Sequence, residues 1–167
     1  MEIKYSLSND TWGKEEYEAV ERVLKSNQFT MGENVAAAEK MAAKWFGSKY
    51  AVMSSSGSAA NLLAVAAMVY SGRLDKGDEV LAPAVSWSTT YFPLEQMGLH
   101  IRLVDIDRET LNMDMKKAEQ VVTDKTKAVF AVNLLGNPND FDELSAFCTR
   151  HNLILMEDNC ESMGAKF

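Results

Sequence analysis

The sequence contains little cysteine, histidine or proline. Of its 167 residues, two are cysteine, two are histidine and three are proline. Cys148 and Cys160 are too few for a disulfide framework, and with two scattered histidines they show no zinc-ligand spacing. We therefore predict reduced thiols and no metal site.

Long apolar runs and an excess of positive charge are also missing. No stretch approaches the roughly 18 uninterrupted apolar residues of a membrane span. Residues Met1–Tyr5 lack the basic cap and the apolar core of a signal peptide. Acidic residues outnumber basic ones by 24 to 17, and the net charge of −7 has the wrong sign for gripping nucleic-acid phosphates over a broad patch. These absences predict a cytoplasmic protein that binds neither a membrane nor a nucleic acid.

The composition that remains is that of a globular protein, with 47% hydrophobic and 25% charged residues. Residues 1–48 are predicted to form an N-terminal helical arm, with helices at 14–25 and 33–46. From residue 49 onward, short apolar runs alternate with helical segments. Strands are predicted at 50–53, 79–82, 101–104, 127–132 and 153–156, and helices at 87–97, 113–122 and 140–151. A further helix is predicted to follow the small residues 54–58 and to end at 69. This alternation is typical of βαβ units, so we predict an α/β fold with a mainly parallel sheet and helices on both faces.

Candidate binding residues follow three of the predicted strands, where parallel sheets bind their ligands. The small residues Ser54–Ser58 open a helix, and its free N–H groups and dipole suit a single phosphate. An ordinary serine N-cap is the alternative. Asp158 is expected at the end of a buried central strand, either paired with a heteroaromatic cation or solvated. Trp87 is expected either to stack on a flat cofactor or to pack in the core.

Together these features resemble the DegT/DnrJ/EryC1/StrS sugar aminotransferase family over essentially the whole chain. The segments similar to its core motifs are 76–80 (KGDEV), 104–107 (VDID) and 110–112 (TLN). A narrower resemblance, to the nucleotide-sugar 3-dehydratase branch, rests on 29–33 (FTMGE), 83–91 (PAVSWSTTY), 133–138 (NLLGNP) and 157–164 (EDNCESMG). The resemblance implies that residues 49–167 form the first part of the large domain of a fold-type I pyridoxal-phosphate-dependent transferase.

The resemblance also assigns roles to five residues. Gly57 and Ser58 would bind the phosphate of pyridoxal 5'-phosphate or pyridoxamine 5'-phosphate, and Trp87 would stack on its ring. Asp158 would pair with the ring nitrogen, which keeps the ring protonated as an electron sink. Glu161 would lie near the ring oxygen. Asp158 and Glu161 are the catalytic candidates within this chain.

The reaction implied by the resemblance removes the C3 hydroxyl of a nucleotide-linked 4-keto-6-deoxyhexose, for dideoxysugars of the lipopolysaccharide O-antigen. A GDP-linked substrate is preferred, a CDP-linked one stays open, and a homodimer is expected. The family's base, a histidine in dehydratases and a lysine in aminotransferases, is expected beyond Phe167, so this chain alone would lack complete catalytic machinery. Two alternatives remain: a nucleotide-sugar aminotransferase with the same pocket, and a fragment that only binds phosphate or cofactor weakly.

Overall fold

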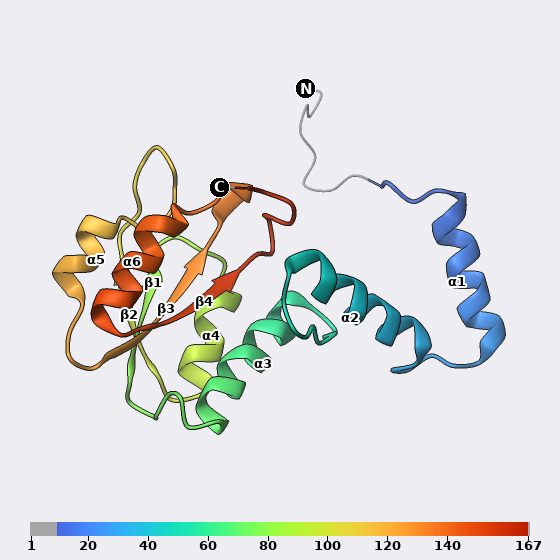
Figure 1. Ribbon diagram of the computed structural model, residues 1–167, viewed down its shortest axis with the longest axis horizontal. Helices are drawn as coiled ribbons and strands as arrows, with labels where there is room; N and C mark the ends of the chain where they lie inside the picture. Colours follow the sequence, from blue (N-terminus) through green and yellow to red (C-terminus); the bar gives the residue numbers. More distant parts are fainter. Residues whose placement is uncertain (1–9, 167) are drawn as a thin grey trace. The chain divides into compact units, whose positions relative to one another are not determined.

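A computed structural model describes residues 10–166, which divide between two compact units, Met1–Met53 and Ser54–Phe167 (Figure 1). The described part of the first unit contains two helices at the predicted positions, α1 (Lys14–Ser26) and α2 (Glu33–Phe46). Neither helix has a buried residue within the described chain, and large apolar side chains such as Trp45 remain 74% exposed. Across residues 10–166, every helix is too short or too polar to cross a membrane.

The second unit is built on four parallel strands in the order β2–β1–β3–β4 (Figure 1). Its elements, in chain order, are α3 (Gly57–Tyr70), β1 (Glu79–Pro83), α4 (Ser88–Gln96), β2 (His100–Val104), α5 (Met115–Val121), β3 (Thr126–Val132), the 3-10 turn η1 (Leu134–Gly136), α6 (Phe141–His151) and β4 (Ile154–Asp158). The predicted α/β fold with a parallel sheet is therefore confirmed.

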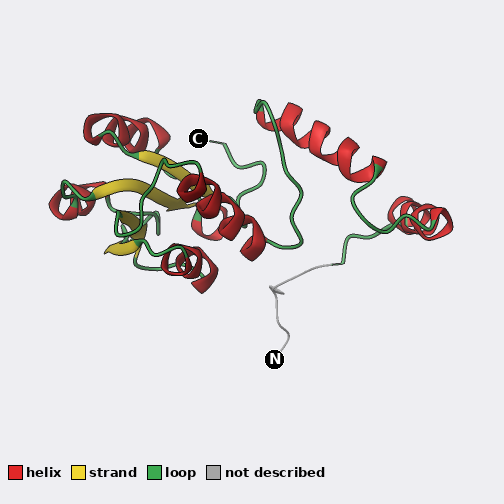
Figure 2. Cartoon of the chain, turned by 90° about the horizontal axis from the view of Figure 1, so that it is seen from below, coloured by secondary structure: helices red, strands yellow, loops and turns green. Residues whose placement is uncertain are grey.

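Helices cover both faces of this sheet (Figure 2). Because successive strand residues point to opposite faces, Val80 and Phe130 pack with α3 and α4, whereas Leu81 and Val129 pack with α5 and α6. All four side chains are at most 1% exposed. Each such burial contributes about 1.5–3 kcal/mol, so β1 and β3 are held from both sides.

Residues 50–53, predicted as a strand, form none. No described segment pairs with them, and the Met53 N–H instead donates to the Glu39 carboxylate at 2.8 Å. Tyr50 is 74% exposed and Val52 is 68% exposed. The prediction was wrong because an apolar run becomes a strand only where a neighbouring strand completes its backbone hydrogen bonds.

The last strand, β4, lies at an edge of the described sheet. The sequence predicts a buried central strand there, but within residues 10–166 β4 pairs with β3 alone. Val132 and Asp158 lie opposite each other in the β3–β4 register, so the two strands end together. Asp158 is consequently half-buried rather than enclosed.

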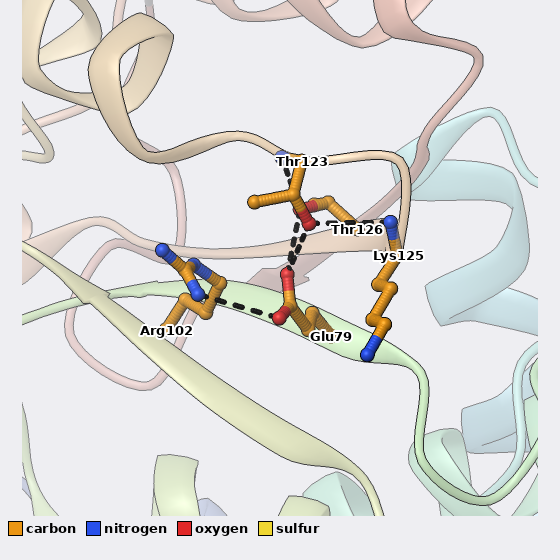
Figure 3. Close-up of polar contacts among 5 residues, drawn as sticks. All are labelled: Glu79, Arg102, Thr123, Lys125 and Thr126. Carbon is orange, nitrogen blue, oxygen red and sulfur yellow. Dashed lines mark hydrogen bonds and ion pairs between the residues drawn. The ribbon is translucent and has the colours of Figure 1, made fainter.

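A polar cluster links the first residue of β1 to the middle of β2 and to the start of β3 (Figure 3). Glu79, whose side chain is 13% exposed, accepts hydrogen bonds from the Thr123 hydroxyl at 2.5 Å and the Thr126 hydroxyl at 3.3 Å, and from Arg102 at 3.3 Å. The Thr123 hydrogen bond and the nearby Arg102 charge lower the pKa of Glu79, against the opposing effect of burial. The cluster lies away from the carboxyl ends of the strands and holds β1, β2 and β3 in register.

Candidate active site

Two helix starts and one strand end meet at the carboxyl edge of the sheet. Asn61 comes from the second turn of α3, Thr90 comes from the first turn of α4, and β4 ends at Asp158. Asn61 Nδ2 lies 2.8 Å from Asp158 Oδ2, and Thr90 Oγ1 lies 3.1 Å from the same oxygen. The helix that opens with Gly57 is thus tied directly to Asp158, although the two lie about a hundred residues apart in sequence.

The amino end of α3 offers an anion site. The Ser56 hydroxyl accepts the N–H of Ala59 at 3.2 Å, so the serine cap is present. The N–H groups of Gly57 and Ser58 have no partner within the described chain, and both residues are exposed. A helix of 14 residues adds the positive end of its dipole, so these two groups suit one phosphate.

Gly57 leaves room for a ligand to approach this backbone. A Cβ placed on it would meet nothing closer than the Cys160 sulfur, at 3.9 Å. Its φ is not positive, so the chain conformation does not require glycine there. The short distance to Cys160 also brings the start of α3 beside the segment that follows Asp158.

The carboxylate of Asp158 is surrounded by hydrogen-bond donors. Asn61 and Thr90 donate to Oδ2, and the Cys160 N–H donates to Oδ1 at 3.2 Å. Asn61 is 9% exposed and Thr90 is fully buried. Donors on both carboxylate oxygens fix the orientation of Asp158 at the end of β4.

Trp87 lies at the cap of α4, where its carbonyl accepts the N–H of Thr90 at 3.0 Å. Its side chain is 76% exposed, which excludes the alternative of a core tryptophan within this chain. The exposed indole of Trp87 therefore lies between the end of β1 and the start of α4. Such a surface is available to a flat ligand.

Glu161 is held by the turn that follows β3. Its Oε2 accepts the N–H of Leu135 at 2.5 Å, and its carbonyl lies 3.0 Å from a Cβ placed on Gly136. Gly136 has a φ of +83°, so this turn needs glycine both for its conformation and for the close approach of Glu161. The side chain of Glu161 remains exposed and is fixed at one carboxylate oxygen.

A buried amide network supports the segment that carries Glu161. Asn133, 3% exposed, donates to Asn159 at 2.9 Å and to Ser162 at 3.2 Å, and accepts from Asn139 at 2.7 Å. Asn133 follows a predicted strand in the sequence, which is the signal that points to it. Asn139 and Thr90 carry no such signal, because each becomes important only through contacts made by the folded chain.

Pyridoxal phosphate or pyridoxamine phosphate fits this set of groups. The pair of N–H groups at Gly57 and Ser58 suits its phosphate, Asp158 suits its ring nitrogen, and Trp87 offers an exposed aromatic face. Residues 10–166 show no group of three acidic, histidine or cysteine side chains that suits a metal ion.

Comparisons with known proteins agree with this reading. Residues 10–167 match the DegT/DnrJ/EryC1/StrS aminotransferase family. The chain is 54% identical over 166 residues to the GDP-4-keto-6-deoxy-D-mannose 3-dehydratase of Yersinia pseudotuberculosis. The aligned residues make up 98% of this chain and 42% of that protein. The enzyme of the same description from Escherichia coli O55:H7 is 57% identical over 167 residues, covering 99% and 43%.

A solved structure shows the same similarity in three dimensions. The E. coli GDP-4-keto-6-deoxy-D-mannose 3-dehydratase with bound hydrated PLP matches with a TM-score of 0.93 and 57% identity, over 99% of this chain and 43% of that one. The chain therefore spans about two-fifths of the length of these relatives. The predicted family resemblance is confirmed.

Proposed function

Because the chain belongs to the DegT/DnrJ/EryC1/StrS aminotransferase family, we propose that it acts in a nucleotide-sugar 3-dehydratase that depends on pyridoxal or pyridoxamine phosphate. It contributes the first part of the cofactor-binding α/β domain. The substrate is a GDP-linked 4-keto-6-deoxyhexose, which loses its C3 hydroxyl. The observation that carries this proposal is the identity of 54% and 57% to two GDP-4-keto-6-deoxy-D-mannose 3-dehydratases over nearly the whole chain.

The geometry at the sheet edge supports this assignment. Gly57 and Ser58 hold the phosphate through their N–H groups, and Asp158 accepts the N–H of the ring. When bound, the cofactor supplies a protonated pyridine ring that takes up the electrons released as a neighbouring C–H bond breaks. Asp158 would hold that proton on the ring nitrogen by accepting a hydrogen bond from it.

The two remaining candidates are proposed to meet the same cofactor. Trp87 covers one face of the ring with its exposed indole, and Glu161 lies toward the ring oxygen, held by the N–H of Leu135. Neither side chain is enclosed by the described residues, so both are free to meet a ligand. These roles make Asp158 and Glu161 the catalytic residues that this chain supplies.

We further propose that the protein is a cytoplasmic homodimer. Large apolar side chains are exposed in each unit taken by itself, among them Trp45 at 74% and Tyr70 at 84%. Exposed apolar surface of this kind marks sites of association. GDP is the preferred nucleotide because both curated relatives are described as acting on a GDP-linked sugar.

The test uses the protein expressed from its complete gene, mixed with pyridoxamine phosphate and GDP-4-keto-6-deoxymannose. Mass spectrometry of the sugar should reveal a product lighter by one oxygen atom. A product in which an amino group replaces the keto oxygen would instead establish an aminotransferase. Binding of the cofactor without either product would contradict the assignment as an enzyme.

A further inference from the structure

We propose that Asn61 and Thr90 are positioning residues that fix the carboxylate of Asp158 by binding one of its two oxygens, so that the other oxygen meets the ring nitrogen. The inference rests on the proposed function and adds how the carboxylate is oriented. Asn61 comes from α3 and Thr90 from α4, so two separate helices set the position of a residue on β4.

The amide of Asn61 has a determined orientation. Its nitrogen lies 2.8 Å from Asp158 Oδ2 and 3.3 Å from the carbonyl oxygen of Thr89. Both neighbours are acceptors, so only the NH₂ group satisfies them and a flipped amide would lose both bonds. Since Asn61 is 9% exposed, solvent offers little replacement.

The hydroxyl of Thr90 has a determined direction as well. It lies 3.1 Å from Asp158 Oδ2 and 2.9 Å from the Ser86 hydroxyl. A hydroxyl carries one proton, and the carboxylate only accepts, so Thr90 donates to Asp158 and Ser86 donates to Thr90. Ser86, Thr90 and Asp158 therefore form a chain of hydrogen bonds with a single direction.

The two carboxylate oxygens are consequently unequal. Oδ2 receives two donors from well-buried side chains, whereas Oδ1 receives the Cys160 N–H alone, at 3.2 Å. Oδ1 therefore has the greater remaining capacity for a charged N–H donor. Loss of the Thr90 hydroxyl would leave Asn61 as the side chain that holds Oδ2, and would weaken the hold of Asp158 on the ring.

The test compares matched threonine variants in the protein expressed from its complete gene. Thr90→Val keeps the shape and removes the hydroxyl, and it should weaken pyridoxamine phosphate binding about tenfold or more, as expected for a lost charge-assisted hydrogen bond. Thr90→Ser should restore binding to within about twofold because it retains the donor. Thr149→Val makes the same change at an exposed position of α6, away from Asp158, and should leave binding unchanged.

A spectroscopic readout separates positioning from simple loss of structure. The absorption spectrum of the bound cofactor reports whether its ring nitrogen is protonated, and only Thr90→Val should reduce the protonated form. Circular dichroism checks folding, and Asn61→Leu serves as the second variant if Thr90→Val does not fold. Wild-type affinity and spectrum in the folded variants would overturn this inference alone. A wild-type protein that binds no cofactor would overturn the proposed function and this inference together.

Discussion

Replacing Gly57 by alanine should have opposite effects on the stability of the fold and on the binding of the cofactor phosphate. The added Cβ meets only the Cys160 sulfur, at 3.9 Å, which is an ordinary contact, and φ is not positive. Glycine costs a helix about 1 kcal/mol relative to alanine in its interior, so Gly57→Ala at the first helical position should raise the free energy of unfolding by up to about that amount. Structure alone therefore gives no reason to keep glycine here.

The same methyl group lies beside the N–H groups that are proposed to hold the phosphate. Gly57→Ala should weaken pyridoxamine phosphate binding by tenfold or more, or about 1.4 kcal/mol, because the ligand can no longer approach the backbone closely. Thermal denaturation measures the first effect and fluorescence titration the second. The expected result is a protein that is more stable and binds less.

Gly72→Ala is the matched control. Gly72 has a φ of +70° and no atom within 4 Å of an added Cβ, so alanine there meets only backbone strain. That strain should cost about 1 kcal/mol and leave binding unchanged. If Gly57→Ala bound pyridoxamine phosphate as well as the wild type, the phosphate site at the start of α3 would be refuted.

Two further predictions concern the thiols and the acid stability. Burial raises the pKa of the Cys148 thiol to about 11, so at pH 8 only about one molecule in a thousand carries the Cys148 thiolate. A maleimide should therefore label the exposed Cys160 before the buried Cys148. Equal labelling rates of the two cysteines in the folded protein would contradict this. Because the Thr123 hydrogen bond lowers the folded-state pKa of Glu79 below its usual value of 4.5, its stabilisation should be present above that pH and disappear as the pH falls through the lowered value. The difference in melting temperature between wild type and Glu79→Gln should therefore shrink in acid, whereas the exposed Glu95→Gln should show no such trend.

The sequence predicts elements best where one local pattern is enough. The helix that follows Ser56 and the strand that precedes Asp158 are both present, because an N-cap and a run of apolar residues act over a few positions. The strand at 50–53 fails because its hydrogen-bond partners would have to come from elsewhere in the chain. The edge position of β4 is hidden for the same reason, since strand order depends on pairing between distant segments.

In the candidate site, too, the sequence predicts residues that belong to a local pattern and misses residues that matter only through contacts with distant segments. Asp158 and Gly57 stand out because strand ends and helix starts are readable from residue types in order. Thr90 does not stand out, because a threonine in the first turns of a helix is ordinary until a carboxylate from β4 arrives beside it. The family resemblance names the groups proposed to bind the cofactor, but the side chains proposed to orient Asp158 follow from the folded arrangement.

The Glu79 cluster and the candidate active site lie at opposite ends of the short strand β1. β1 has five residues, so its two ends lie roughly 13 Å apart. A substitution in the Glu79 cluster therefore changes how the strands are joined at one end and leaves Trp87, beyond the other end, untouched.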